Sequence, residues 1–558
     1  MEEVDNLERR PSQARTEHEG ILEEESLEAR VERLGRERPQ CFKTPGSELA
    51  FCFSILMCQI LAVSVQTDAF EGPVSYGRQG ITEYFVSGFN IILPTLVKEL
   101  SIPQAASTWP ASAFSLVTAS TLFIFGRLSD MYGGQPVYLF GLAWLTIWSL
   151  VAGFSQNELM MDFCRALQGF GPAAFLPSSV MILGKTYRPG PRKNLVFSIY
   201  GSCAVLGFYL GILISGVAAQ LLRWNWYFWV GAILAFITTI VTLFAVPSDT
   251  SEIRASKATM DWLGAILLVP GLILLTFSIT ESSHAPSGWK TPYIPTLLVV
   301  GILFLAAFTY AEGWVSPNPL LPPSLFKIPH MTALTIALLF SFGNLGIYLL
   351  YTTFYMENIL HLTPLLVVAY VTPMCVGGLI LSTLGGLLLH LIPGTALLLF
   401  SSLAWVASSL LFALLPTHDP SYWSYIFPSM LCATLGIDII YNATNVFVTT
   451  SLPAAQQGLA GSLVNSVLYF GIAILLGFSD IAQTQALRGG ARLRESYKVV
   501  FWFEVACNLV ALAVVAMSVR VGRARSELTV DERVVLERLA TREVEREGER
   551  ERGVGGGL

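Results

Sequence analysis

Long apolar runs, separated by short polar or Pro/Gly-containing breaks, dominate the chain between about residue 50 and residue 520. A helix that crosses about 30 Å of hydrocarbon needs roughly 20 mostly apolar residues, and about fourteen runs of this kind occur. After an interrupted first run they cover approximately residues 105–125, 136–155, 160–184, 195–221, 225–246, 261–280, 293–313, 331–355, 364–389, 394–415, 422–449, 458–482 and 499–520. The runs lack the alternation of barrel strands, so the pattern predicts an all-α membrane protein.

A polar segment interrupts the first run. Phe51 to Val65 and Ser87 to Val97 are each too short to cross a bilayer, whereas joined directly they would form one span of ordinary length. We interpret residues 66–86 as an insertion into this span, of a kind that would arise from intervening sequence kept by a faulty gene prediction. The alternative is a genuine loop that joins two broken half-helices, which transporters tolerate where backbone lines a cavity.

Composition supports a membrane protein. Of the 558 residues, 53% are hydrophobic and only 13% are charged, against roughly 25% charged in soluble globular chains. The net charge of −6 comes largely from the Glu- and Arg-rich tails, residues 1–50 and 521–558, and no basic stripe is left for phosphates. This excludes a nucleic-acid-binding protein. The N-terminal tail does not resemble a cleaved signal peptide. We therefore expect the first span to remain in the protein as a membrane anchor.

The cysteines do not indicate a disulfide framework or a metal site. Most of the eight lie inside apolar runs, without CxxC pairs or nearby histidine ligands. No nucleophile or Gly-rich phosphate loop stands at a usable spacing either. We therefore expect no metal, no cofactor and no enzymatic activity.

Lysine and arginine in the short loops indicate the orientation. With the N-terminus inside, the cytoplasmic loops contain Arg127, Lys185, Arg188, Arg192, Lys193, Arg254, Lys257 and Lys327. The opposite loops contain Lys98, Arg223 and Lys290, and a basic last loop opposes the trend with Arg488, Arg492, Arg494 and Lys498. Basic residues directly after the final run, together with an even number of spans, favour cytoplasmic positions for both termini.

Charged side chains inside apolar runs are candidates for function, because each costs about 2.5 to 3.5 kcal/mol on insertion. Arg165 opens the segment RALQGFGPAA, where Gln168 lies on the same helix face and small residues allow close helix packing. The alternative is a structural arginine that pairs with Asp162 or extends to the membrane surface.

Asp438 lies deep in another run, on a polar stripe that follows one helical face. The stripe consists of Thr434, Asp438, Tyr441, Asn442, Asn445 and Thr449. Desolvation favours the neutral form of an unpaired carboxyl group, so Asp438 is a candidate for taking up and releasing a proton. The alternative is a protonated carboxyl group that hydrogen-bonds to neighbouring helices.

Two further polar stripes occur in the runs at 331–355 and 458–482. They contain Asn344, Tyr348, Tyr351, Thr352 and Tyr355, and Gly458, Gly461, Ser462, Asn465 and Tyr469. We expect a polar, aromatic substrate cavity, suited to planar or cationic solutes. Its predicted lining residues are Asn344, Tyr348, Tyr351, Asn442, Asn445 and Asn465. Tight helix packing explains the small residues of these stripes equally well.

The segment GRLSDMYGG, residues 126–134, ends the second run. Its glycines permit a tight turn, and Asp130 can lie against the positive N-terminus of a neighbouring helix. With RALQGFGPAA and the number of runs, it resembles the signature G-x-L-x-D-x-x-G of the major facilitator superfamily. The resemblance implies a conformational latch formed by Gly126, Arg127, Leu128, Asp130 and Gly133, and a role in proton coupling for Arg165 and Gln168 beside Asp438.

The number of spans is similar to that of the fungal fourteen-span drug:proton antiporter group, in the branch that includes aminotriazole-resistance exporters and low-affinity ammonium transporters. The resemblance implies a six-helix bundle at residues 51–247, two extra spans at 248–320 and a second six-helix bundle at 321–520. These bundles would rock about a midplane site. We expect a monomer whose partners are a small-molecule substrate, protons and the lipid bilayer, in the plasma membrane or alternatively the vacuolar membrane.

Two features depart from the family pattern. The basic residues expected after the latch are absent, so the latch would have to use Arg127 or Arg188. The antiporter signature G-x-x-x-G-P-x-x-G-G is reduced to Gly201, Gly207 and Gly211 without a proline, so we assign these glycines to helix packing and leave the direction of transport open.

The leading hypothesis is a proton-coupled exporter of small organic toxicants, drugs or metabolites that works by alternating access. One alternative is an uptake carrier for a small cation such as ammonium, which the same branch permits. Another is a non-transporting membrane sensor, which long cytoplasmic tails would favour, although the tails here have the composition of charged disordered segments.

Overall fold

The regular elements of the described chain are all helices. A computed structural model describes residues 39, 42, 44–57, 81–103, 107–186, 191–247, 259–416, 420–451 and 457–521, with the side chains of some helical residues left out. The two tails therefore lie outside the described residues almost entirely. An all-α membrane fold was the prediction, and it is confirmed.

The helices form two sets with an extra pair between them in the sequence. The first set is α3 (Pro45–Met57), α4 (Ile81–Glu99), α5 (Trp109–Tyr132), α6 (Gly134–Ala152), α7 (Glu158–Gln168), α8 (Phe170–Thr186), α9 (Pro191–Gln220) and α10 (Asn225–Ala245). The extra pair is α12 (Trp262–Glu281) and α13 (Tyr293–Tyr310), with the short turns η2 (Gly288–Lys290), η3 (Ala311–Val315) and η4 (Pro323–Lys327). The second set is α14 (Met331–Asn358), α15 (Pro364–Leu391), α16 (Gly394–Ala413), η5 (Tyr422–Ile426), α17 (Phe427–Thr450), α18 (Gln457–Arg488) and α19 (Leu493–Ser518).

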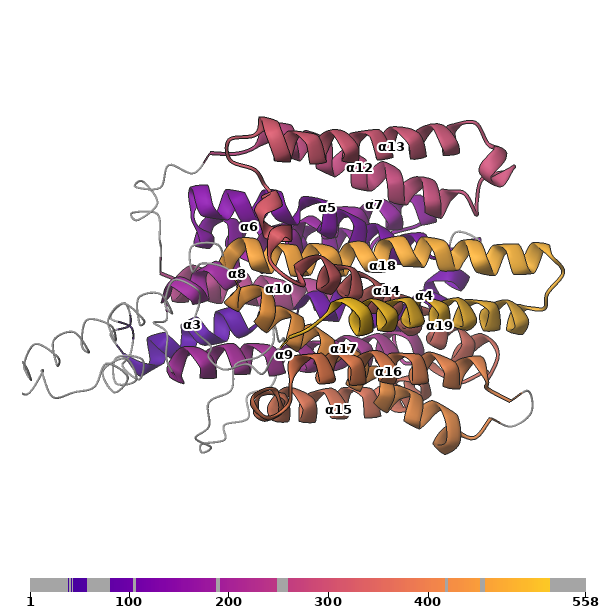
Figure 1. Cartoon of the computed structure of the whole chain (residues 1–558). Coiled ribbons are helices and arrows are strands. Elements are labelled where there is room, and N and C mark those ends of the chain that lie inside the picture. The colour runs from indigo at the N-terminus through magenta and orange to yellow at the C-terminus, as the bar shows by residue number, and fades with distance from the viewer. Residues whose placement is uncertain are drawn as a thin grey trace, which may run out of the picture.

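We refer to the sets as the N-terminal and C-terminal bundles. The helices run roughly parallel to one long axis, and the pair α12–α13 lies along one side, over α5 and α18 (Figure 1). The end at which α3 begins and α19 ends is called the tail end, and the opposite end, with the α12–α13 and α18–α19 turns, is called the far end.

Within the described residues, 12 helices are long and apolar enough to cross a membrane. The described part of α9 qualifies only as a shorter apolar helix, Val205–Gln220. If α9 counts as one further span, and α3 together with α4 as another, the described residues agree with the fourteen spans that the sequence predicts.

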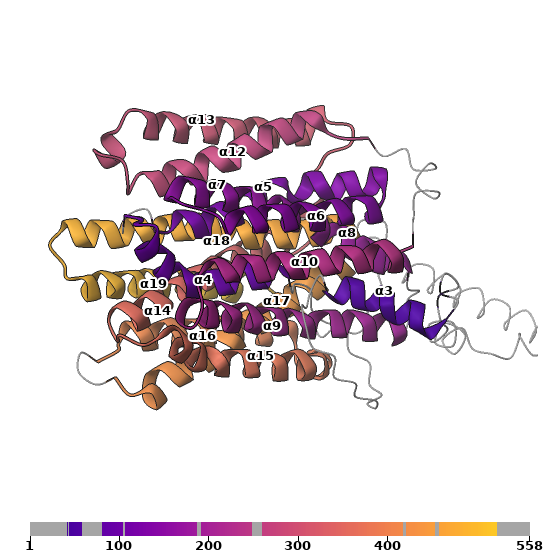
Figure 2. The same ribbon diagram turned by 180° about the vertical axis from the view of Figure 1, so that it is seen from behind.

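The helices α3 and α4 together follow the path of one span, because they pack against the two halves of α10 (Figure 2). Near the tail end, the Ser54 hydroxyl lies 2.6 Å from that of Thr242 in α10. Near the far end, Tyr84 and Tyr227 each donate a hydroxyl hydrogen bond to the other's carbonyl oxygen, at 2.7 and 2.9 Å. Of the proposed insertion, residues 81–86 belong to α4 and residues 66–80 lie outside the described residues, so the insertion stays a prediction.

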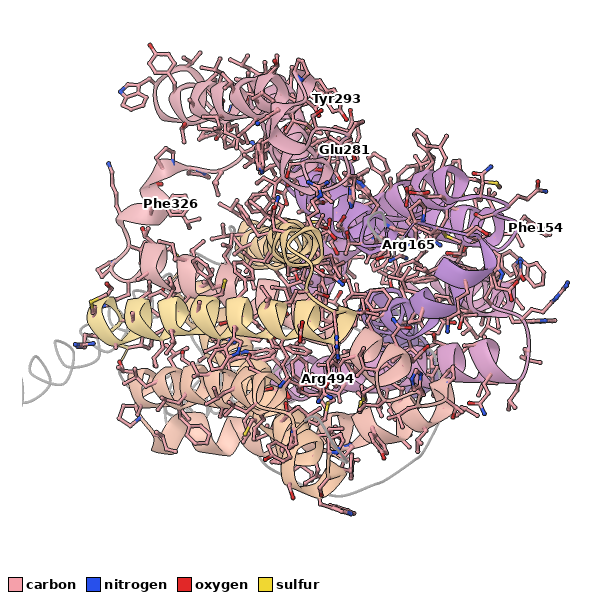
Figure 3. The ribbon with its side chains drawn as sticks, turned by 90° about the vertical axis from the view of Figure 1, so that its right-hand side faces the viewer. Phe154, Arg165, Glu281, Tyr293, Phe326 and Arg494 are labelled. Carbon is pink, nitrogen blue, oxygen red and sulfur yellow. The ribbon has the colours of Figure 1, made fainter. Side chains whose placement is uncertain are left out.

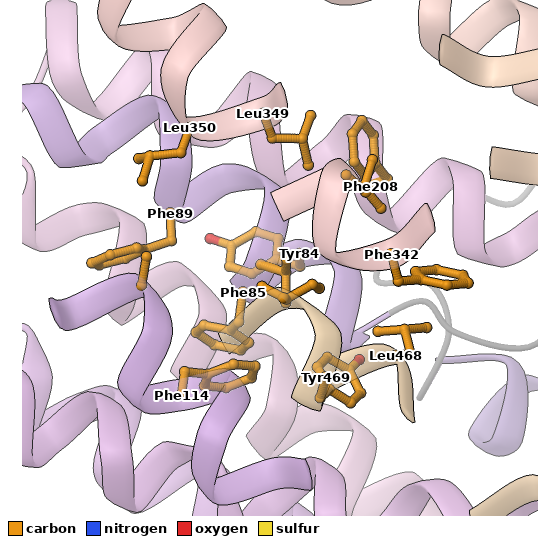
Figure 4. Packing of buried hydrophobic residues seen from close by; sticks show 14 of the residues in the cluster. Tyr84, Phe85, Phe89, Phe114, Phe208, Phe342, Leu349, Leu350, Leu468 and Tyr469 are labelled. Carbon is orange, nitrogen blue, oxygen red and sulfur yellow. The ribbon is translucent and has the colours of Figure 1, made fainter. Parts of the chain in front are cut away.

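Several pairs of helices join the two bundles, chiefly α5 with α18 and α9 with α15, and also α8 with α18 and α4 with α14. Aromatic and aliphatic side chains from both bundles pack between them, among them Phe85 and Phe89 of α4, Phe342 of α14 and Tyr469 of α18 (Figure 4). At the far end of this seam, the Gln220 side-chain oxygen of α9 accepts a hydrogen bond from the Leu365 backbone N–H of α15 at 3.0 Å. The bundles are thus in contact along shared helix faces, which is the surface that any rocking motion must rearrange.

Candidate functional site

Arg165 of α7 is 1% exposed, the most buried cation among the described residues of the N-terminal bundle. Its Nε and one Nη donate to the carbonyl oxygens of Pro110 in α5 and Phe85 in α4, both at 3.1 Å. The other Nη donates to the Gln168 side chain at 3.1 Å, and Gln168 in turn donates to the Ser149 hydroxyl of α6 at 3.0 Å. Arg165 and Gln168 therefore tie four elements of this bundle together, as their shared helix face predicts.

Two aromatic rings complete the surroundings of Arg165. Its guanidinium carbon lies 4.0 Å from the ring centre of Phe89 and 4.4 Å from that of Phe114. Within the described chain it forms no salt bridge, so pairing with Asp162 does not occur, and its burial excludes extension to the surface. A guanidinium held by carbonyl dipoles and ring faces keeps its charge without a fixed counter-ion. Figure 3 shows Arg165 inside the N-terminal bundle, away from the labelled Arg494 of the C-terminal bundle.

Asp438 lies halfway along α17, at the seam between the bundles. The Thr434 hydroxyl, one turn earlier, donates to its Oδ2 at 2.8 Å. A Cβ atom built on Gly378 of α15 would lie 3.0 Å from this carboxylate oxygen and 3.3 Å from Val205 of α9. Gly378 thus leaves the space in which a carboxyl group of one bundle approaches a helix of the other. Among the described residues no cation pairs with Asp438.

The polar residues of α14 face the interior of the C-terminal bundle. Asn344 donates to the side-chain oxygen of Asn508 in α19, and the Tyr348 hydroxyl lies 2.8 Å from that of Ser429 in α17. Tyr351 packs edge-on against Tyr497, with ring centres 6.1 Å apart. All three predicted cavity residues of α14 are fully buried in this conformation.

The remaining predicted cavity residues lie on α17 and α18. Asn442 and Asn465 are buried, and the side chain of Asn445 lies outside the described ones. A substrate cavity lined by these residues stays a prediction.

The predicted latch lies at the tail end, where α5 meets α18. A Cβ atom on Gly126 would lie 2.6 Å from the Ser462 hydroxyl of α18, so this glycine permits contact between the bundles. Gly133 has a φ of 108°, which a residue with a side chain rarely adopts, and it forms the turn between α5 and α6.

The other latch residues are Arg127, Leu128 and Asp130, all partly buried. Arg127 Nε donates to the Thr259 carbonyl oxygen at 3.0 Å, in the segment before α12. Arg188, the other cation proposed for the latch, lies outside the described residues. A latch function for these residues stays a prediction.

The glycines of the reduced antiporter signature belong to α9. Gly211 lies against α4, where an added Cβ would be 2.6 Å from the Tyr84 carbonyl oxygen. Gly207 is buried, and the surroundings of Gly201 lie outside the described ones. The close contact of Gly211 with α4 agrees with the predicted role of this glycine in helix packing.

Glu504 of α19 is a buried carboxylic acid that the sequence analysis does not select. It is 0% exposed and accepts a hydrogen bond from Ser409 of α16 at 2.9 Å. Asn508 donates to the same serine hydroxyl at 2.8 Å, so Glu504 extends the polar network of Asn344. Glu504 could have been selected from the sequence, because it is a lone glutamate within an apolar run. The same criterion selected Asp438.

Comparisons with known proteins agree with this geometry. A family model described as Major Facilitator Superfamily matches residues 79–476. The low affinity ammonium transporter of Saccharomyces cerevisiae is 34% identical and covers 73% of this chain and 80% of its own length. The aminotriazole resistance protein of the same yeast is 30% identical over 89% of each chain. The crystal structure of an auto-inhibited POT family peptide transporter has a TM-score of 0.59 at 15% identity, covering 87% of this chain and 99% of its own, which shows the shared fold.

Proposed function

Since this chain belongs to the major facilitator superfamily and is a multi-pass membrane transporter rather than an enzyme, we propose that it exports small organic toxicants, drugs or metabolites by proton-coupled alternating access. The observation that carries the proposal is Asp438, a carboxyl group deep in α17 that faces α9 of the other bundle beside Gly378. A proton that binds there changes the charge at the seam that must open and close. Coupling requires such a difference between states, because a ligand that binds both states equally shifts neither.

Arg165 has a complementary role in this proposal. Its guanidinium holds α4, α5 and α7 together while its positive charge lies within the bundle. The charge disfavours a second cation and attracts an anionic or electron-rich solute on the same side of the seam. The polar residues of the proposed cavity, Asn442 and Asn465, lie on the opposite bundle.

Replacing Asp438 by asparagine tests the coupling. The carboxamide keeps the hydrogen bond with Thr434 but cannot release a proton, so we expect concentrative, pH-driven transport to be lost while solute exchange at equal concentrations persists. The measurement is labelled-solute flux in vesicles with and without a pH gradient. The comparison variant is Glu504→Gln, which neutralises a fully buried carboxyl group of α19 inside the C-terminal bundle and should leave the pH dependence in place. If Glu504→Gln uncouples transport and Asp438→Asn does not, Asp438 is not the coupling residue.

A pair of substitutions tests the latch. In Gly126→Ala the new methyl group meets the Ser462 hydroxyl at 2.6 Å, which hinders closure of the tail end. We expect the transport rate to fall about tenfold, equivalent to roughly 1.4 kcal/mol, within the usual cost of overpacking. The second substitution Ser462→Gly should restore most of the rate. Failure of this rescue, with both variants folded, would contradict a contact that controls the rate.

The direction of transport is tested with labelled aminotriazole and labelled methylammonium. Deletion of the gene should raise cellular accumulation of an exported solute and increase sensitivity to it. The 34% identity with an ammonium transporter favours uptake of a small cation as the second candidate. In that case deletion would instead lower methylammonium accumulation and leave aminotriazole unchanged.

Orientation and assembly belong to the same proposal. We place the tail end in the cytoplasm, because Arg127 near the end of α5 and Lys327 at the end of η4 lie there. The chain would act as a monomer in the plasma membrane, with the bundles at residues 51–247 and 321–520 and the extra spans at 248–320. Protease protection of tags at the two termini tests the orientation.

A further inference from the structure

The extra pair α12–α13 contacts both bundles at the far end. On the N-terminal side, Trp109 at the start of α5 donates its indole N–H to the Glu281 carboxylate of α12 at 3.2 Å. On the C-terminal side, His284, three residues after Glu281, lies with Nε2 2.9 Å from the Asp480 carboxylate of α18. One short segment therefore holds a contact with each bundle.

Further contacts surround this histidine. Its Nδ1 lies 3.7 Å from Glu281, and its ring centre is 6.5 Å from that of Trp109. Ser283 donates to the same carboxylate oxygen of Asp480, while Arg488 of α18 donates to the Ser283 carbonyl oxygen at 2.9 Å. Figure 3 shows Glu281 and Tyr293 of the extra pair close together, and the tyrosine hydroxyl donates to Glu281 at 3.3 Å.

Carboxylates outnumber cations around His284. The facing titratable and charged groups are Glu281 of α12, Tyr293 of α13, Asp480 and Arg488 of α18, and Glu158 and Asp162 of α7, whose charges interact with the imidazole. The side chain of His284 is only 10% exposed. A protonated imidazole at this position neutralises a carboxylate of the C-terminal bundle and attracts those of the N-terminal bundle.

We propose that His284 is a proton-dependent clasp through which the extra helix pair holds the far ends of the two bundles together. The inference rests on the proposed function, because it assumes that the bundles rock. When α5 and α18 separate at the far end, the segment Glu281–His284 cannot follow both. The contact between His284 and Asp480 breaks, water reaches the imidazole, and the proton is released more easily. Acid at the far end therefore favours the closed state.

The electrostatics of the closed state agree with the clasp. Burial by itself lowers the pKa of His284, but the contacts with Asp480 and Glu281 outweigh it and raise the pKa to about 9. An unperturbed histidine titrates near pH 6.5. Protonation thus stabilises the closed state fully below about pH 6.5, and this contribution is lost as the pH rises through about 9.

The test is the distance between spin labels at exposed far-end positions of each bundle. Gln156→Cys and Gly489→Cys introduce the labels in a variant whose native cysteines are replaced. For the purified full chain in lipid nanodiscs, we expect short distances at pH 6 and a growing population of longer ones toward pH 9. His284→Asn should abolish this pH response, and Asp480→Asn should abolish it as well. The control is His361→Asn in the exposed far-end turn between α14 and α15, which should leave the response intact.

Trp109→Phe provides an independent variant, because it removes only the N–H donor to Glu281. It should increase the longer distances at every pH while the titration persists. A full pH response in a folded His284→Asn variant would overturn the clasp. So would a parent chain whose distances change on addition of solute but not with pH, a result that leaves the transport proposal standing. Distances that respond to neither would reject rocking and, with it, both proposals.

Discussion

Replacing Arg165 by lysine is expected to lower transport about 100-fold without removing the positive charge. The guanidinium donates in three directions, to Pro110, Phe85 and Gln168, and lies against two rings. A lysine ammonium in the same space reaches only some of these acceptors. Loss of two charged hydrogen bonds at about 1.5 kcal/mol each corresponds to about 3 kcal/mol, or roughly 100-fold.

The measurement is the initial rate of labelled-solute transport, normalised to the amount of folded protein. Arg223→Lys is the matched control, since Arg223 is exposed in the far-end turn between α9 and α10. We expect that variant to transport at the parental rate. Parental activity in Arg165→Lys would mean that the charge of Arg165 matters and its geometry does not.

Replacing Gly211 by valine is expected to reduce the yield of folded protein more strongly than other single helix substitutions discussed above. A Cβ atom at this position would lie 2.6 Å from the Tyr84 carbonyl oxygen and 2.7 Å from the Tyr84 Cα, both backbone atoms of α4. Backbone cannot rotate away as a side chain does, so α4 would have to move. Overpacking of a filled core costs about 1 to 3 kcal/mol, which lowers the ratio of folded to unfolded molecules roughly 10-fold to 100-fold.

Thermal unfolding of the detergent-purified chain and the fraction of monodisperse protein report this loss. Gly313→Val adds the same side chain at an exposed glycine in η3 that has no neighbouring atom within 4 Å. It should unfold at the parental temperature. Equal stability of the two variants would show that α4 and α9 adapt to the added volume.

The amino-acid sequence alone determined the all-α membrane fold and the number of spans. Runs of about 20 apolar residues leave the backbone no other way to satisfy its hydrogen bonds in lipid. Local spacing also predicted that Arg165 and Gln168 share a helix face, and they do form a hydrogen bond. Gly133 was predictable for a similar local reason, since its turn requires a backbone conformation that few other residues adopt.

Only the tertiary structure decided which side chains face the seam and which are enclosed. Asn344 and Tyr348 share a polar stripe, yet it turns toward α17 and α19, because helical periodicity defines a face but not the helix that covers it. The acceptors of Arg165, the approach of Asp438 to Gly378, and the contact of His284 with Asp480 all join residues from separate helices. Such contacts depend on how helices distant in the sequence pack together, and spacing along one chain does not record that arrangement.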